Sequence, residues 1–291
     1  MTDLQYIIDK INNSQFIEEP FRHLEIKDFL SEEHLNLFTN DKQIHFSVPQ
    51  NSSLKKTFFD NHYNVIPFPG CTVDEDDYFA RLELDKWDDI KNKNNAPENP
   101  NNEIGGFGIA YRLQQYHNST IKKILDFMNS ELFKKTLERK FLLKKETNII
   151  SAVQKYLTKY EISPHADLRK KALTYLLNIN KNEECEHLDI HTHLLKFKKE
   201  YEYIYDIWKE KKYLEKVWVP WSWCESVKQI KKNNTMIIFS PDHRSLHGVN
   251  LNYDHTHLQR TQVYGNLMYK SAPNSKRLSY RSLIKEDNNQ D

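Results

Sequence analysis

The chain has 291 residues, of which 38% are hydrophobic, 29% charged and 12% aromatic, so it can bury a sizeable core in one large domain or two small ones. Its 42 Lys and Arg residues are balanced by 41 Asp and Glu residues, and this net charge of +1 argues against a nucleic-acid partner. The three cysteines, Cys71, Cys185 and Cys224, are too far apart for a disulfide framework or a zinc ribbon, and the sequence lacks a leader peptide and a membrane-spanning apolar run, so we expect a cytoplasmic protein.

The first half of the chain predicts a layer of helices with a few strands. Residues 1–40 are amphipathic, with a short strand near 21–26, and Ser31 followed by two glutamates opens a helix. The Pro- and Asn-rich residues 91–106 predict a long exposed loop rather than a domain linker.

Apolar residues at helical spacing extend over residues 119–138. The pattern is interrupted near Asn129, where Ser130 can cap a second helix. We therefore expect two consecutive helices here, and a support region that ends near residue 147.

After residue 148 the pattern changes to short β-rich runs separated by turns, at residues 149–160, 172–180, 216–219, 235–240 and 260–269. Helices followed by strands predict a mainly β protein with a helical N-terminal layer, in which residues 148–270 form a sandwich or barrel. We expect one domain over residues 1–291.

The runs 172–180 and 260–269 each alternate between apolar and hydrogen-bonding side chains. A sheet with a wet outer face and a barrel with a polar pocket both explain this alternation. The six glycines form no phosphate-binding motif, so the sequence does not indicate a nucleotide site.

A histidine and a carboxylate two residues apart, His165 and Asp167, can point the same way in an extended segment and bind one metal ion. Chance alone gives about two such pairs with 13 His and 41 acidic residues, and the chain has three, beginning at His23, His165 and His187. Context favours His165. His247 follows a strand and can be a third ligand, and Arg260 starts a later strand and can bind a carboxylate bidentately.

Other metal-like groups compete with this set. The residues His187, Asp189, His191 and His193 alternate as an extended zinc site would, although their Lys- and Glu-rich surroundings favour a solvated segment. His243 is an alternative to His247, whereas His255 and His257 lie in a polar turn. The aromatic run of Trp218, Trp221 and Trp223 predicts core packing or a pocket wall.

The order of these motifs over residues 17–270 resembles the 2-oxoglutarate- and Fe(II)-dependent oxygenases, in the prolyl-hydroxylase-like branch. The matching pieces are residues 19–30, residues 127–133, Tyr156, His165-Ala166-Asp167, residues 177–180, Phe239, His247-Gly248-Val249 and Arg260. Many members have Arg-x-Ser where this chain has Arg260-Thr261-Gln262, and residues 181–218 take the place of a Gly-Gly turn. We interpret residues 181–218 as an insertion near the mouth of the site.

The resemblance implies a double-stranded β-helix, also called a jelly roll or cupin-like fold, that binds Fe(II), 2-oxoglutarate and O2 and releases succinate and CO2, with ascorbate as a reductant. His165, Asp167 and His247 would bind iron and Arg260 the distal carboxylate of 2-oxoglutarate. Further cosubstrate contacts would come from Tyr156, Thr174, Asn178 and Gln262. Asp167 argues against a halogenase, because those relatives lack the carboxylate.

The substrate class stays open between a small molecule and a protein side chain. Two other functions remain as alternatives: a non-catalytic jelly-roll binding module, and a zinc hydrolase that uses the segment from His187 to His193.

Overall fold

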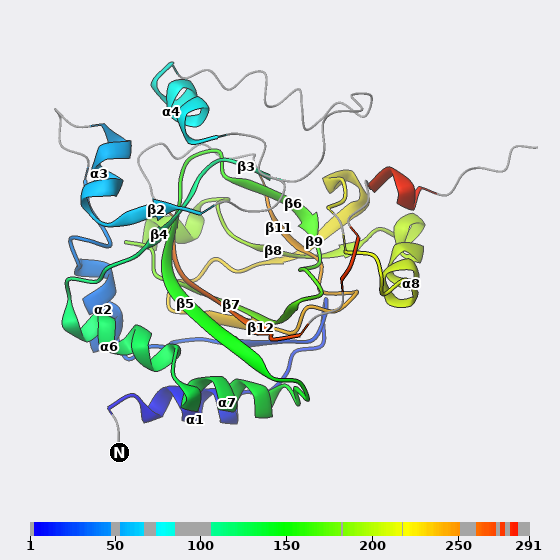
Figure 1. Ribbon diagram of the computed structural model, residues 1–291, viewed down its shortest axis with the longest axis horizontal. Coiled ribbons are helices and arrows are strands. Elements are labelled where there is room, and N and C mark those ends of the chain that lie inside the picture. The colour runs from blue at the N-terminus through cyan, green and yellow to red at the C-terminus, as the bar shows by residue number, and fades with distance from the viewer. Residues whose placement is uncertain are drawn as a thin grey trace, which may run out of the picture.

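Two antiparallel sheets form the centre of the protein (Figure 1). The computed structural model describes residues 3–47, 53–66, 74–84, 106–181, 183–216, 218–250, 260–271, 274–276 and 280–284. The seven-stranded sheet has the order β1 (His23–Ile26), β10 (Met236–Phe239), β7 (Lys171–Asn178), β12 (Arg260–Tyr269), β5 (Thr147–Tyr156), β4 (Ala110–Leu113), β2 (Tyr63–Val65). The five-stranded sheet has the order β3 (Gly106–Phe107), β6 (Glu161–His165), β11 (His247–Val249), β8 (His193–Phe197), β9 (Cys224–Gln229).

From β5 to β12, consecutive strands pass back and forth between the two sheets, apart from the neighbouring pair β8 and β9. This winding is that of a double-stranded β-helix, so the expected fold class is confirmed.

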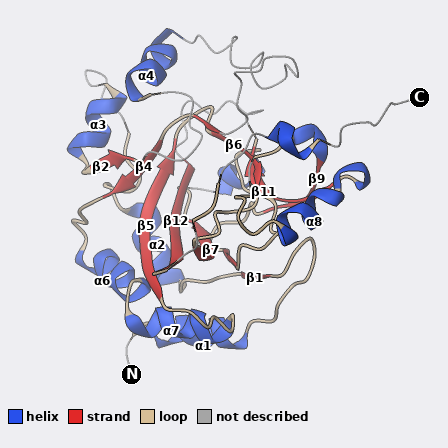
Figure 2. Cartoon of the chain, turned by 45° about the vertical axis from the view of Figure 1, so that its right-hand side comes forward, coloured by secondary structure: helices blue, strands red, loops and turns tan. Residues whose placement is uncertain are grey.

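Helices cover the outer face of the larger sheet (Figure 2). Ser31 and Ser130 cap α2 (Glu32–Asn40) and α7 (Glu131–Lys140) by accepting hydrogen bonds from backbone N–H groups of the first turn, as the sequence predicted. None of the helices in the described part of the chain is long and apolar enough to cross a membrane. The helices are α1 (Gln5–Asn13), α2 (Glu32–Asn40), α3 (Leu54–Asp60), α4 (Glu75–Leu84), α6 (Ser119–Met128), α7 (Glu131–Lys140) and α8 (Tyr203–Glu210), with short 3-10 turns η1 (Glu183–His187), η2 (Lys199–Tyr201), η3 (Trp221–Trp223) and η4 (Tyr280–Leu283).

The alternation of side chains along β5, β7 and β12 separates a dry face from a polar one. Val153, Leu173 and Val263 point outward and pack in one core with residues of α1, α6 and α7. The residues next to them in sequence, such as Gln154 and Gln262, line a cavity between the sheets. The polar face is therefore the wall of an internal pocket and not a wet outer surface.

Two expectations for the middle of the chain need correction. Residues 181–218 are not wholly an insertion, because they contain β8, which lies between β11 and β9 in the smaller sheet. Residues 216–219 do not form a strand in their described part. The backbone N–H of Val219 donates to the carbonyl of Pro164, and the segment around it lies across the cavity instead of joining a sheet.

The predicted loop at residues 91–106 lies outside the described residues, apart from Gly106 at the start of β3. The expectation of a single domain stays a prediction.

Candidate metal centre

The smaller sheet brings His165, Asp167 and His247 together. His165 ends β6 and is the direct cross-strand partner of His247, which begins β11. Asp167 follows two residues after His165, and its carboxylate lies 3.8 Å from the Nε2 atom of each imidazole. Within the described ranges, no other group of three or more His, Cys, Asp or Glu side chains is arranged to hold a metal ion.

Backbone carbonyls fix the orientation of both imidazoles. The Nδ1 atom of His165 lies 2.8 Å from the carbonyl oxygen of Ser163, and that of His247 lies 2.9 Å from the carbonyl oxygen of Ser245. Since a carbonyl can only accept, each Nδ1 carries the hydrogen and each Nε2 keeps a free lone pair. Both lone pairs thus belong to the atoms that lie nearest Asp167.

The protonation of His247 suits a metal ligand. Burial, and next the neighbouring His165, lower the pKa of His247 to about 3. The imidazole is therefore neutral at pH 7, which is the form that binds metal ions.

The spacing of the three ligand atoms fits a single ion. Metal–nitrogen and metal–oxygen bonds of about 2.1 Å place adjacent ligands of an octahedral ion about 3 Å apart. The ligand atoms here lie within 4.8 Å of one another, so shifts of less than about 1 Å would close them around an ion. Two histidines and one carboxylate form the facial set that is typical of non-haem Fe(II).

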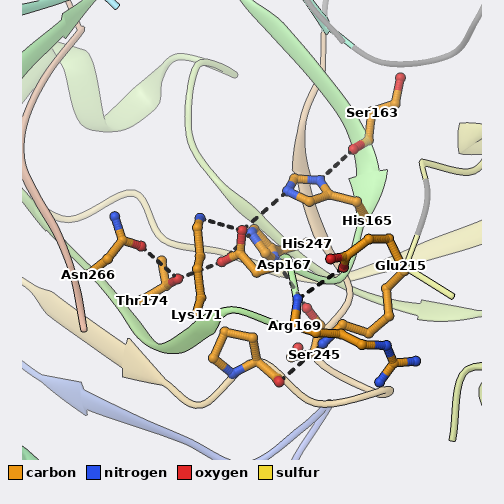
Figure 3. A network of polar contacts seen from close by, with 12 residues as sticks. Ser163, His165, Asp167, Arg169, Lys171, Thr174, Glu215, Ser245, His247 and Asn266 are labelled. Carbon is orange, nitrogen blue, oxygen red and sulfur yellow. Dashed lines mark hydrogen bonds and ion pairs between the residues drawn. The ribbon is translucent and has the colours of Figure 1, made fainter. Parts of the chain in front are cut away.

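Lys171 and Thr174 hold the carboxylate of Asp167 in place (Figure 3). The Nζ atom of Lys171 donates to Oδ1 and the hydroxyl of Thr174 donates to Oδ2, each over 2.5 Å. Burial would raise the pKa of Asp167, but Lys171 and the two histidines outweigh it and hold this pKa well below its usual value. Asp167 is therefore ionised and has both oxygens in defined positions.

A cavity of about 270 Å³ adjoins this group and contains a buried arginine, Arg260. The side chain is only 2% exposed, and its guanidinium carbon lies 4.7 Å from the ring centroid of Tyr156. Its Nη2 atom donates to the hydroxyl of Thr192 over 2.9 Å, whereas Nε and Nη1 have no hydrogen-bond partner among the described residues. An arginine cannot lose its proton in a protein, so this cation requires an anion that is not part of the described chain.

The remaining residues expected to contact a cosubstrate have different positions. Tyr156, Thr174 and Gln262 line the cavity. Asn178 does not line it, because its amide donates to the carbonyl of Ile230 and accepts a hydrogen bond from Gln262. Asn178 therefore positions Gln262, and Thr174 positions Asp167.

The competing metal-like residues form no group of three in the described part of the chain, although the carboxylate of Asp189 lies 3.5 Å from Nε2 of His193. His191 is hydrogen-bonded to the carbonyl of Cys185, while the ring nitrogens of His193 face Ser226 and Gln229. His243 lies beside the ring of Tyr205, with ring centroids 6.4 Å apart. The histidines at 255 and 257 lie outside the described residues.

The glycine after His247 has a steric role. A Cβ atom on Gly248 would lie 3.0 Å from the carbonyl oxygen of Ile162 and 3.2 Å from the nitrogen of Pro164. Glycine therefore lets β11 approach β6 closely enough to bring the two imidazoles together, with ring centroids 4.5 Å apart.

Sequence reasoning missed several polar residues of the cavity, among them Arg112, Lys171, Thr192 and Lys216. Arg112, Lys171 and Lys216 lie in no recognisable motif, and Thr192 lies between two histidines of the segment considered as a zinc site. The alternation along β4 was the one available signal, since Arg112 pairs with Gln154 and points to the same side of the sheet.

No protein-family model matches the chain, and neither does any curated protein sequence. Among solved structures, the chain is similar to a Pseudomonas putida prolyl-4-hydroxylase, with a TM-score of 0.43, 9% identity, and coverage of 92% of this chain and 99% of that chain. It is also similar to a prolyl hydroxylase from Trichoplax adhaerens in complex with a hypoxia-inducible-factor peptide fragment, with a TM-score of 0.43, 10% identity, and coverage of 91% and 89%.

A third similar structure is a non-heme alpha-ketoglutarate-dependent epimerase from nogalamycin biosynthesis, with a TM-score of 0.34, 10% identity, and coverage of 90% and 81%. At such low identities and TM-scores, these likenesses by themselves assign no activity to the chain.

Proposed function

We propose that this protein is a 2-oxoglutarate- and Fe(II)-dependent dioxygenase, most simply a hydroxylase of a small molecule or a protein side chain. The observation that carries the proposal is the buried edge of Arg260, which has no partner in the described ranges, in the same cavity as His165, Asp167 and His247. A metal site alone would fit many proteins. A metal site together with a fixed cation fits a ligand that has a carboxylate at one end and a chelating group at the other.

2-Oxoglutarate has this combination of groups. Its keto acid end can bind an ion held by three protein ligands, because such an ion keeps open positions. Its distal carboxylate would accept hydrogen bonds from Nε and Nη1 of Arg260, the two donors that now lack partners.

The protein's own groups would hold these ligands with little rearrangement. The ring of Tyr156 and the hydroxyl of Thr192 fix the plane of the Arg260 guanidinium. Lys171 and Thr174 fix the Asp167 carboxylate, so that a bound metal meets preformed ligands.

When bound, Fe(II) would supply the oxidising chemistry with O2, and 2-oxoglutarate would leave as succinate and CO2, with ascorbate as an auxiliary reductant. The cavity wall would limit access of water to the reacting atoms. Apolar side chains such as Leu176 and Val249 form part of it.

The test is Fe(II)-dependent formation of succinate from 2-oxoglutarate, with O2 uptake measured in parallel. We expect turnover in the unaltered protein and its loss in His165→Ala and His247→Ala. His243→Ala is the matched control, because His243 is near His247 in sequence but lies apart from the metal group. Succinate formation that persisted in both His165→Ala and His247→Ala would overturn the proposal.

Two outcomes would support the alternatives. A binding module without catalysis would show neither O2 uptake nor succinate. A zinc hydrolase would retain stoichiometric zinc in His165→Ala.

A further inference from the structure

The cavity has more positive charge than the proposed ligands neutralise. Its described lining contains Arg112, Lys171, Lys216 and Arg260 but only one acidic side chain, Asp167. This is an excess of three positive charges when the histidines are neutral. Fe(II) and the 2-oxoglutarate dianion cancel each other, so the loaded cavity would keep the same excess.

Lys216 is a buried basic residue of this lining that the proposed metal and cosubstrate would not neutralise. Its side chain is buried, with 4% exposure, and it lines the cavity. Its one hydrogen bond goes from Nζ to the carbonyl oxygen of Pro241 over 3.1 Å. No carboxylate in the described part of the chain lies within ion-pair distance of it.

The carboxylates of Asp167, Asp242 and Glu215 act on the charge of Lys216 from beyond ion-pair distance, and each is hydrogen-bonded to other groups. Asp167 accepts from Lys171 and Thr174, and Asp242 accepts from two backbone N–H groups of its own turn. Glu215 accepts from the backbone of Arg169 and from a serine hydroxyl.

Lys216 lies in the segment that crosses the cavity beside the metal group. Two residues later, the ring of Trp218 lies 6.3 Å from that of His165, and Val219 is hydrogen-bonded to Pro164 of β6. Lys216 and Trp218 both line the cavity, so they offer a cation and an aromatic surface side by side. Burial lowers the pKa of Lys216 to about 8, which leaves the amine mostly protonated at pH 7.

Arg112 adds a second basic group on the larger sheet. With the Gln154 amide oriented to satisfy both neighbours, its oxygen accepts from Nη2 of Arg112 at 2.7 Å and its nitrogen donates to Tyr156 at 2.8 Å. The partner of Arg112 is thus a neutral amide, and no described carboxylate pairs with it.

We propose that the oxidised substrate is a small molecule that carries a carboxylate or phosphate group, bound by Lys216 with Arg112 as a second basic contact. The proposal rests on the proposed function, since it concerns the space that remains when metal and cosubstrate are bound. Binding of an anion is favourable here, because a buried ammonium group without a counter-ion has a high desolvation cost that an ion pair offsets. The apolar wall beside Trp218 would receive the uncharged part of the same molecule.

The experiment uses the full chain, loaded with Mn(II) and 2-oxoglutarate under argon at pH 7. Loading is measured first by Mn(II) and 2-oxoglutarate titration. Calorimetric titration then compares benzoate and phenyl phosphate with neutral benzamide. We expect at least one of the two anions to bind at least tenfold more tightly than benzamide, and the better of the two identifies the anionic group.

The variant Lys216→Met keeps most of the side-chain volume and removes the charge. We expect it to weaken binding of the better anion at least tenfold while its affinity for benzamide changes less than threefold. Lys212→Met is the matched control, because it removes an exposed positive charge from the same segment. If Lys216→Met does not fold, the proposal is tested by the comparison of the three probes in the unaltered protein and by Arg112→Met, which should weaken binding of the better anion more than binding of benzamide.

The failures of the two proposals are distinguishable. If Mn(II) and 2-oxoglutarate do not bind to the unaltered protein, the proposed function fails. If both bind but neither anion binds more tightly than benzamide, the anionic substrate is wrong. It is also wrong if Lys216→Met weakens 2-oxoglutarate binding and not that of the anion, because Lys216 would then be a cosubstrate contact.

Discussion

Replacing Arg260 with methionine removes a buried cation whose Nε and Nη1 atoms have no partner within the described chain. If these two donors bind the distal carboxylate of 2-oxoglutarate, the variant loses a bidentate, charge-assisted pair. Each hydrogen bond to a charged group contributes about 1.5–3 kcal/mol, and part of this is offset by desolvation of the ligand. We therefore expect a loss of about 2–4 kcal/mol, or roughly 30- to 1,000-fold in 2-oxoglutarate affinity.

The same substitution should not destabilise the protein without ligands. In the unliganded protein, Arg260 makes one stabilising side-chain hydrogen bond to a described residue, Thr192. Its buried charge, which has no counter-ion in the described chain, destabilises the folded state. Losing that bond costs about 1 kcal/mol, whereas relief of an unpaired buried charge is worth at least as much. The free energy of unfolding of Arg260→Met should therefore equal or exceed that of the unaltered protein.

Both quantities are measurable on one preparation. Titration of the Mn(II)-loaded protein under argon gives the affinity for 2-oxoglutarate, and urea unfolding gives stability. Arg139→Met is the matched control, since Arg139 is exposed on α7, and it should leave the affinity unchanged. An unchanged 2-oxoglutarate affinity in Arg260→Met, with Mn(II) still bound, would refute the assignment of Arg260.

Three further predictions concern the groups around the site and the sheet. Thr174→Val removes the hydroxyl that donates to Asp167, and we expect Mn(II) affinity to fall about tenfold; an unchanged dissociation constant, followed by electron paramagnetic resonance, would contradict the positioning role. Gly265→Ala places a Cβ atom 2.2 Å from Cζ of Tyr175, so urea unfolding should show a free energy of unfolding that is lower by about 1–3 kcal/mol. Adding Tyr175→Leu to the same chain should restore part of this stability. Equal losses in the single and double variants would exclude the clash as the cause. Burial, and next Lys155, lower the pKa of His45 to about 3, below the value of about 6.5 in unfolded chains, so the unfolded state binds the proton first and stability is lost as the pH falls from about 6.5 towards 3. In urea unfolding at a series of pH values, His45→Gln should therefore lose less stability over this range than the unaltered protein. The same loss in both proteins would show that His45 does not cause it.

The sequence predicted those parts of the fold that depend on local spacing. The two serine caps and the alternation along β7 and β12 are short-range patterns, and the structure has them at the expected positions. The alternation did not reveal which face was internal. That depends on the helices α1, α6 and α7 covering the opposite face, which is a tertiary fact.

The site was only partly predictable for the same reason. His165 and Asp167 are two residues apart, and a strand brings His247 opposite His165. Lys171, Thr192 and Lys216 come from different segments and meet only in the folded cavity. Within the sequence, each is a common polar residue in a polar neighbourhood. The strand β8 was missed because its five residues follow a Glu- and His-rich turn that does not resemble a strand boundary.

The buried cations of this protein differ in what can neutralise them. Lys155 is fully buried, is hydrogen-bonded to Thr261, and has a pKa that burial lowers to about 7, so it can give up its proton. Burial also lowers the pKa of Lys216, to about 8, so this amine too can give up its proton at a small cost in free energy. Arg260 has no such option, because a guanidinium stays charged at any pH at which the protein folds.

Lys155 points away from the cavity, on the opposite face of β5 from Tyr156, whereas Lys216 and Arg260 both line the cavity. Of these three buried cations, Lys216 and Arg260 are therefore placed where an anionic ligand can reach them, and Lys155 is not. This distribution supports the proposal that the charges of Lys216 and Arg260 serve ligand binding, and two anionic ligands, the proposed cosubstrate and the proposed substrate, would balance them.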